Sequence, residues 1–211
     1  DHPIVNLSWH DMLKWCNARS EMEGQEPVYF VDAGQLEVLR RGMPDMRNDQ
    51  VHWEASGYRL PTEAQWEYAA RGGLAGQLYS YGDTLGNKDA NFGNSKGSAR
   101  AVGSLRPNGY GLYDIAGNVW EACWDRFAKD WYVHPDASGQ NPIGPDEGDI
   151  RVVRGGSYRK SAKYCEVAYR NNFNKTWTNY PIGFRVAVPQ AIPVFSNEVQ
   201  NRIFTIVGDE L

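Results

Sequence analysis

The sequence predicts an α+β domain that is rich in loops and has little regular secondary structure. Two segments have the apolar spacing of a helix, and both end before residue 74. From residue 74 onward, Gly, Asn, Asp, Ser and Pro recur every few residues and leave no room for another long helix. The candidate strands are short and far apart. We therefore expect two helices to pack on a small sheet that long loops surround.

Each predicted helix has a start signal, an apolar stripe and a stop signal. The segment 8–20 has an N-cap serine, apolar side chains at i, i+3, i+4 and i+7, and a glycine beyond its end: Ser8, then Trp9, Met12, Leu13 and Cys16, then Gly24. The segment 60–73 has a capping box, an apolar stripe and a double-glycine stop: Thr62 with Gln65, then Trp66, Ala69 and Ala70, then Gly72 and Gly73. Such patterns are typical of amphipathic helices that turn one face to a core.

The strands are expected to be brief, at Ile4–Leu7, Val28–Val31, Val119–Cys123, Arg151–Arg154 and Gly183–Val188. The long loops between them need a core of their own, which large rings can supply: Tyr79, Tyr81, Phe92, Tyr110, Tyr113, Trp120, Trp124, Phe127, Trp131 and Tyr132. We divide the chain into a domain over residues 1–188 and a C-terminal extension over 189–211. The alternating residues 203–207 of the extension predict an edge strand.

Charge and composition exclude several classes of function. The 22 basic and 26 acidic residues give a net charge of −4 without a basic block, which argues against a nucleic-acid partner. No apolar run is long enough for a transmembrane segment. The three cysteines are too few for a disulfide framework, and the histidines lack the spacing of a zinc site. An extracytoplasmic, cell-surface or virion location is favoured, and the oligomeric state is left open.

The segment NGYGLYDIAGNVWEA, residues 108–122, has the composition of a cation-binding turn. Its glycines permit tight turns, and three oxygen-bearing side chains follow one another closely: Asp114, Asn118 and Glu121. Calcium takes about six to eight oxygen ligands, so a calcium site is one interpretation. The other is an ordinary polar turn with an Asx-type hydrogen bond from Asp114, because the spacing differs from that of the EF-hand loop.

A later segment, residues 154–173, surrounds Cys165 with Lys160, Lys163 and Arg170. Such cations could lower the pKa of the thiol and favour a reactive thiolate. Alternatively, Cys165 is a small buried hydrophobic residue. The spacing alone leaves both interpretations open.

Three blocks in this order resemble the formylglycine-generating enzyme (sulfatase-modifying factor) family. They are RLPTEAQWEYAARGG at 59–73, NGYGLYDIAGNVWEA at 108–122, and RVVRGGSY followed by a cysteine, AYRN and IGFRVA between 151 and 187. With the opening PIVNLSWHDMLKWCN, the resemblance covers residues 3–188. It implies the formylglycine-generating-enzyme-like variant of the C-type lectin fold, a loop-rich fold with bound calcium.

The resemblance also implies calcium ligands. One site falls on Asp114, Gly117, Val119 and Glu121, where the glycine and the valine contribute main-chain carbonyls. Another site would begin at Asn91 and Phe92, but residues 95–102 lack the acidic ligand that completes it in the family.

Members of the family that make formylglycine have two cysteines after a GGS-aromatic sequence, which bind copper(I) and oxidise a substrate cysteine with oxygen. Alignment on GGSY at 155–158 places the second cysteine on Cys165, next to the matching Tyr164, and the first on Lys160. Copper(I) prefers two thiolates and an ammonium repels it, so we expect neither copper nor formylglycine synthesis. If the protein is an enzyme, the resemblance assigns catalytic roles to Cys165, Ser157 and Tyr164.

Relatives without the cysteine pair include inactive paralogues and the variable proteins of diversity-generating retroelements, which bind ligands near the C-terminus. Residues 159–181 interleave rings with amides, as recognition surfaces do, and we assign ligand binding to Arg159, Lys160, Tyr164, Tyr169, Asn171, Phe173, Asn174, Trp177, Asn179 and Tyr180. A solvated loop with a few rings tucked inward is the other interpretation. The expected function is a calcium-stabilised binding module for a protein or peptide. The alternative is an oxidoreductase of this family with a single cysteine, and a structural subunit comes third.

Overall fold

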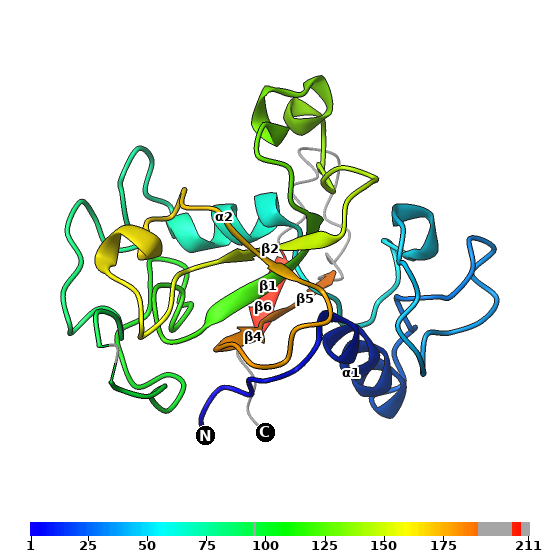
Figure 1. Ribbon diagram of the computed structural model, residues 1–211, viewed down its shortest axis with the longest axis horizontal. Coiled ribbons are helices and arrows are strands. Elements are labelled where there is room, and N and C mark those ends of the chain that lie inside the picture. The colour runs from blue at the N-terminus through cyan, green and yellow to red at the C-terminus, as the bar shows by residue number, and fades with distance from the viewer. Residues whose placement is uncertain (95, 190–203, 208–211) are drawn as a thin grey trace, which may run out of the picture.

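The computed structural model describes residues 1–94, 96–189 and 204–207. In these residues it has two α-helices, α1 (Trp9–Met22) and α2 (Glu63–Arg71), and a sheet in the order β3-β2-β1-β4. The strands are β1 (Trp120–Arg126), β2 (Ile150–Arg154), β3 (Asn171–Asn174) and β4 (Ile182–Phe184). A smaller sheet pairs β5 (Val186–Pro189) with β6 (Phe204–Val207). Short 3₁₀ turns are η1 (Asn48–Gln50), η2 (Trp131–Val133), η3 (Pro135–Ser138) and η4 (Ala162–Cys165). Loops make up the rest (Figure 1), so the predicted loop-rich α+β fold is confirmed.

Both helices begin where the sequence predicts. At α1, the Ser8 hydroxyl accepts from the Asp11 N–H at 3.2 Å, and Asp11 Oδ2 accepts from the Ser8 N–H at 3.1 Å. At α2, the Thr62 hydroxyl accepts from the Gln65 N–H at 3.3 Å, and Gln65 Oε1 accepts from the Thr62 N–H at 3.1 Å. Gly72 ends α2 in the left-handed conformation, with φ 56°. Local hydrogen bonds therefore determine both starts.

The larger sheet is covered on both faces. Along β1, Trp120, Ala122 and Trp124 join the apolar cluster that contains α1, whereas Cys123 joins the cluster that contains Trp66 of α2. Successive side chains of a strand point to opposite faces. The two helices therefore lie on opposite sides of the sheet, as Figure 1 shows, and all seven residues of β1 are buried.

Two predicted strands do not form. Residues 4–7 belong to no strand, and residues 28–31 make only isolated bridges. The reason for the second is Asn17 of α1, whose Oδ1 accepts from the N–H groups of Val28 and Tyr29 at 3.0 Å each. Its Nδ2 donates to the Tyr29 carbonyl at 2.8 Å. A buried amide thus takes the hydrogen bonds that a neighbouring strand would otherwise satisfy.

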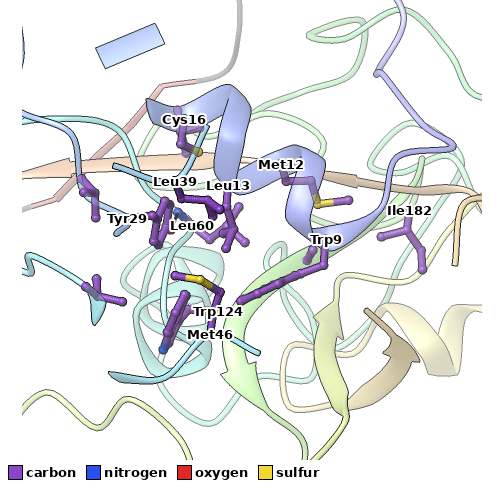
Figure 2. Packing of buried hydrophobic residues seen from close by; sticks show 14 of the residues in the cluster. Trp9, Met12, Leu13, Cys16, Tyr29, Leu39, Met46, Leu60, Trp124 and Ile182 are labelled. Atoms are coloured by element: carbon purple, nitrogen blue, oxygen red, sulfur yellow. Dashed lines mark hydrogen bonds between the residues drawn. The ribbon is translucent and has the colours of Figure 1, made fainter. Parts of the chain in front are cut away.

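The largest apolar cluster lies around α1. Figure 2 shows Trp9, Trp124 and Tyr29 gathered beside the helix, with the rings of Trp9 and Trp124 5.2 Å apart and Tyr29 stacked on Trp124 at 5.5 Å. The Arg151 guanidinium lies 3.7 Å from the centre of the Trp9 ring. The Trp9 indole N–H donates to the Cys123 carbonyl at 3.0 Å. Rings from a helix, a loop and a strand together form the core that a loop-rich chain needs.

The rings that were expected to pack the loops are not all buried. Those that are buried are Tyr79, Trp120, Trp124 and Trp131, and Tyr81, Phe92 and Phe127 are half-buried. Tyr110, Tyr113 and Tyr132 are exposed, so a core role for them is wrong. Tyr113 is 45% exposed, and Tyr110 meets the exposed Tyr68 of α2 at the surface, with ring centres 5.7 Å apart.

A buried ion-pair network fastens α2 to the sheet. The Glu63 carboxylate is 1% exposed and lies 2.7 Å from both Arg154 Nη1 and Arg170 Nε. Arg154 also reaches Glu67 Oε2 at 2.6 Å. Asp125 on β1 accepts from the Glu63 backbone N–H at 2.6 Å. Burial raises the pKa of Asp125 to about 7, and the charge of Glu63 adds to the rise.

The end of the described chain runs through the smaller sheet, where Val186 lies opposite Val207. Of the predicted edge strand, residue 203 lies outside the described residues, and the division at residue 188 stays a prediction. Within the described ranges, no helix combines the length and the apolar character needed to cross a bilayer.

Candidate functional site

The site is built on the turn that follows β2. Gly155 and Gly156 both have positive φ, 87° and 80°. A Cβ at Gly156 would lie 2.6 Å from Cys165 Sγ, so glycine is required for η4 to pack against the turn. The Lys160 N–H donates to the Ser157 carbonyl at 2.9 Å. The GGSY sequence thereby brings Ser157, Lys160 and η4 into one region.

Two buried polar atoms of this region have no hydrogen-bond partner among the residues that the structure describes. One is the Ser157 hydroxyl oxygen, on a fully buried residue. The other is the indole Nε1 of Trp120, which is 1% exposed. Buried polar groups are nearly always hydrogen-bonded, and an unpaired one costs roughly 1–3 kcal/mol. A ligand that bonds to both atoms would remove both costs.

Trp120, Tyr164 and Tyr169 form a cluster that we call the aromatic wall. Tyr164 meets the Trp120 ring edge-on with centres 6.4 Å apart, and Tyr169 lies at the same distance from Trp120. The two tyrosines are 4.9 Å apart and half-buried. Lys160 Nζ lies 5.3 Å from the centre of the Tyr164 ring, within cation–π range. The wall thus presents ring surface with one ammonium at its edge.

Cys165 is not activated. It is 2% exposed, and burial raises the pKa of its thiol to about 12. The cations considered as a means of lowering this pKa are placed elsewhere: Arg170 pairs with Glu63, Lys160 lies over a tyrosine ring, and Lys163 is exposed. The thiolate interpretation is therefore wrong, and Cys165 is a small buried hydrophobic residue.

Copper(I) does not fit the residues present. The three cysteines lie in three different apolar clusters, Cys16 on α1, Cys123 on β1 and Cys165 in η4. Lys160 stands at the position that the family resemblance assigns to the first copper cysteine. A neutral buried thiol without a second thiol beside it does not supply the two thiolates that copper(I) prefers.

Asp114, from the predicted calcium loop, has one oxygen that a cation would satisfy. Its backbone is left-handed, with φ 54°, and its Oδ2 accepts from the Gly103 N–H at 2.7 Å. Its Oδ1 is buried and has no partner in the described part of the chain. Burial raises the pKa of the carboxyl, and the charge of Glu121 adds to the rise. A nearby cation would offset this cost.

The Glu121 carboxylate is already paired. Arg185 Nη2 lies 2.6 Å from Oε1, Arg185 Nε lies 2.8 Å from Oε2, and the Trp66 indole N–H donates to Oε2 at 2.5 Å. A carboxylate has about four lone-pair sites, so one on Oε1 remains for a metal. The calcium ligands therefore fit in part, with Asp114 Oδ1 as the open donor. Arg185 also interrupts the predicted strand 183–188, dividing it into β4 and β5.

The loop between these two acids is joined to the loop that contains Asn91. Gly117 has φ 80°, and a Cβ there would collide with the Asn91 carbonyl oxygen. The Asn118 N–H donates to the same carbonyl at 2.8 Å, and Asn91 Nδ2 donates to Asn118 Oδ1 at 3.4 Å. One lone pair of the Asn91 carbonyl is thus used to hold the two loops together.

A cavity of about 360 Å³ opens beside Asn91 and Phe92. The charged residue in its lining is Arg100, and the described lining residues include no carboxylate. A calcium site needs acidic oxygen ligands, and a guanidinium repels the ion. The residues of this cavity therefore do not fit calcium, and the metal role considered for Asn91 and Phe92 is not supported.

The residues assigned to ligand binding fall in two places. Lys160, Tyr164 and Tyr169 lie at the aromatic wall, and Asn171, Asn174, Trp177, Asn179 and Tyr180 lie in β3 and the turn after it. Arg159 lies apart from both, with its guanidinium 5.3 Å from the centre of the Tyr158 ring. Trp177 and Tyr180 are exposed for 52% and 44%, and their ring centres are 5.9 Å apart. Phe173 is 2% exposed, because β3 turns it toward the cluster around α1. A ligand-binding role for Phe173 is therefore wrong.

Trp120, Arg185 and Arg100 are functional candidates that the sequence pattern alone does not single out. Trp120 and Arg185 stand inside quoted family blocks, in NVWEA and GFRV, so a signal for them exists. The signal for Arg100 is weaker, a cation in the segment where the family has an acid.

The sequence of this chain is similar to those of several known proteins. Residues 1–190 match the sulfatase-modifying factor enzyme 1-like domain. The formylglycine-generating enzyme of Streptomyces coelicolor is 42% identical over 204 residues, covering 89% of this chain and 52% of that protein. The chaperone protein LppX of Paenibacillus barcinonensis is 30% identical over 213 residues, covering 88% of this chain and 69% of that protein. The chain thus spans about half the length of the Streptomyces enzyme.

A solved structure is similar as well. Treponema denticola variable protein 1 has a TM-score of 0.76 and 35% identity, covering 89% of this chain and 71% of that one.

Proposed function

This chain belongs to the family of sulfatase-modifying factor enzyme 1-like domains, and from that premise we propose that it is a calcium-stabilised binding module for a protein or peptide ligand. The observation that carries the proposal is the pair of buried atoms, Ser157 Oγ and Trp120 Nε1, that have no partner in the described residues. A ligand that bonds to both gains free energy that the unliganded protein lacks. The similarity to Treponema denticola variable protein 1, a retroelement variable protein, supports a binding role.

The chemistry of the aromatic wall suits a peptide. A peptide backbone offers a carbonyl that can accept from the Trp120 indole and an N–H that can donate to the Ser157 hydroxyl. Tyr164 and Tyr169 offer rigid ring surface at low entropic cost, and Lys160 adds a charge at the edge. Rigid rings beside adaptable polar groups are typical of recognition surfaces.

Selection from a random peptide display library tests the proposal, followed by calorimetry on the selected peptide. Ser157→Ala and Tyr164→Ala are expected to weaken binding at least tenfold, because each removes a group that the proposal assigns to the ligand. Tyr68→Ala is the matched control, since Tyr68 is an exposed tyrosine on α2, outside the proposed surface. A library that yields no binder, or equal affinities for all variants, would contradict the proposal.

The alternative function is an oxidoreductase of the same family that uses Cys165 alone. The 42% identity to the Streptomyces coelicolor enzyme favours it. The burial of Cys165 and the raised pKa of its thiol count against it, because the thiolate is the reactive form. Mass spectrometry decides: a cysteine-containing sulfatase peptide is incubated with the protein, copper and oxygen. Conversion of the thiol to an aldehyde, lost in Cys165→Ser, would establish the alternative.

Calcium is the metal that we propose for the loop 114–121. Asp114 Oδ1 and the remaining lone pair of Glu121 Oε1 would bind it, together with the main-chain carbonyls of Gly117 and Val119. Oxygen-only ligands suit a hard cation. The bound ion would supply positive charge to a carboxyl whose pKa burial raises, and would thereby stabilise the loop.

A further inference from the structure

The cavity beside Asn91 has a positively charged lining residue, whereas a calcium site is lined by negatively charged carboxylates. Its volume is about 360 Å³, and its lining includes Asn87, Asn91, Phe92, Asn94 and Arg100. We propose that it binds an oxyanion, a carboxylate, sulfate or phosphate group, with the Arg100 guanidinium as the anchoring group. The inference does not rest on the proposed function, because its anchoring residue, Arg100, belongs neither to the aromatic wall nor to the loop 114–121.

The charge of Arg100 is not compensated. Within the described residues it forms no ion pair, and no carboxylate lines the cavity. The nearest acid along the chain, Asp89, is already used: its Oδ1 lies 2.6 Å from Arg106 Nε, and its Oδ2 accepts from the Gly86 N–H at 2.9 Å. Arg100 is an exposed residue of the lining, so its guanidinium is open to an anion from solution and can form charge-assisted hydrogen bonds with it.

The segments around the cavity carry further basic residues. The Gly93 N–H donates to the Lys160 carbonyl at 2.7 Å, and the Asn94 N–H donates to the Tyr158 carbonyl at 2.8 Å, so these two segments run side by side. The basic residues of the two segments and their neighbours are Lys88, Lys96, Arg159 and Lys160. None of them forms an ion pair with a residue that the structure describes. Lys160 Nζ lies over the Tyr164 ring and Arg159 lies over the Tyr158 ring, so these two cations add a long-range positive potential to the region and no direct contact in the cavity.

Arg100 is held at its backbone. Its N–H donates to Asn118 Oδ1 at 2.9 Å, and Asn118 Nδ2 donates to its carbonyl at 3.3 Å. Asn118 is 2% exposed, so this anchor is itself fixed. Only the side chain of Arg100 then needs to be ordered on binding, which lowers the entropic cost.

The chemistry of the lining selects oxyanions over other ions. A guanidinium presents a planar fork of N–H donors that matches two oxygens of a carboxylate, sulfate or phosphate. The carboxamides of Asn87 and Asn94 can add N–H donors. Chloride is a single centre and cannot form the two parallel N–H···O bonds that the fork makes with two oxygens, and Ca²⁺ is repelled by the positive charge.

An NMR titration tests the proposal. Protein labelled with ¹⁵N-arginine is titrated with sodium sulfate, sodium acetate, a tri-glutamate peptide with blocked ends and its tri-glutamine analogue, with sodium chloride holding the ionic strength constant. We expect a saturable shift of the Arg100 side-chain resonance. Arg100→Gln should weaken binding at least tenfold, whereas Arg41→Gln, an exposed arginine outside the cavity, should change it less than twofold. Melting temperatures verify that both variants fold.

The probes distinguish two sources of the anion. Tighter binding of the tri-glutamate peptide than of acetate, without binding of the glutamine analogue, supports the site as a receptor for acidic side chains. Tighter binding of sulfate supports it as a receptor for a free tetrahedral anion. The proposal is overturned if no probe saturates, or if Arg100→Gln binds as tightly as the unsubstituted protein. It is also overturned if Ca²⁺ binds and Asn91→Ala abolishes that binding.

Discussion

Arg185 forms a bidentate ion pair with the carboxylate of Glu121, with Nη2 2.6 Å from Oε1 and Nε 2.8 Å from Oε2. The two side chains are 8% and 9% exposed. The indole of Trp66 donates to the same carboxylate, so α2, β1 and the residue after β4 converge on one acid. Loss of either charge would leave the other buried and unpaired, which costs more than the intact pair contributes.

Arg185→Met is therefore expected to destabilise the protein by about 3–5 kcal/mol, measured by urea denaturation. Arg47→Met is the control, because Arg47 pairs with Asp49 at an exposed site where an ion pair contributes about 1 kcal/mol or less. Losses of similar size in the two variants would contradict the role given to Glu121.

Calcium is expected to raise the melting temperature and a chelator to lower it. At a hundredfold excess over Kd, binding to the folded state adds about 2.7 kcal/mol. Asp114→Asn should remove this effect without disturbing the Glu121–Arg185 pair, whereas Asp130→Asn, at an exposed site, should retain it. Equal melting temperatures in calcium and chelator, for protein freed of metal at the start, would exclude the calcium site.

Ser157→Ala is expected to weaken ligand binding without lowering the stability of the free protein. The Ser157 hydroxyl makes no hydrogen bond within the described residues, so its removal breaks none. A serine kept for structure would behave differently, because its loss would lower the melting temperature. Thermal denaturation with and without a selected peptide distinguishes the two cases.

Phe173→Ala and Trp177→Ala are expected to differ in their effect on stability, because Phe173 is a core ring and Trp177 is a surface ring. Phe173 is 2% exposed, and truncation of a buried ring costs about 3–5 kcal/mol. Trp177 is 52% exposed, and its truncation should change stability by only about 0.5 kcal/mol. Urea denaturation measures both, and a large loss at Trp177 would remove it from the proposed surface.

Asp125 is expected to make stability fall as the pH rises through the weakly acidic range. Burial raises the pKa of Asp125 to about 7 in the folded protein, against about 3.9 in an unfolded chain. Between these values the folded state keeps a proton that the unfolded state has lost, so the free energy of unfolding decreases as pH rises from about 4 to about 7. Above about 7 both states have lost the proton, and the contribution is constant.

Asp125→Asn should remove this decline while keeping an acceptor for the Glu63 N–H. Asp130→Asn, at an exposed site, should leave it unchanged. Urea denaturation across that pH range measures the slope. Parallel profiles for the unsubstituted protein and Asp125→Asn would show that Asp125 titrates normally.

The helices could be predicted because their signals are local. Thr62 and Gln65 are three residues apart, and they form their capping box whatever the rest of the chain does. The missing strand at 28–31 could not be predicted in this way. Its competitor is Asn17, a side chain on a helix eleven residues before Val28, and such a bond leaves no periodic pattern in the sequence.

The site could be predicted only in part, for a similar reason. Phe173 and Trp177 look alike in the sequence, each a ring among amides. Their difference arises from pairing, because β3 places Phe173 opposite Arg151 of β2 and turns its ring inward. The burial of Cys165 depends on its contact with Gly156, which composition does not reveal.

The contacts that close the core join residues far apart in the sequence, and this separation limits the rate of folding. The hydrogen bond from Trp9 to the Cys123 carbonyl joins residues 114 apart, and the pair of Glu63 with Arg170 joins residues 107 apart. The entropy of closing such loops is lost before apolar burial compensates for it, so a chain of this topology folds in roughly milliseconds to seconds. Before folding is complete, its large aromatic rings are exposed to solvent and can associate with other chains. Refolding yield should therefore fall steeply as protein concentration rises, and dilution should restore it.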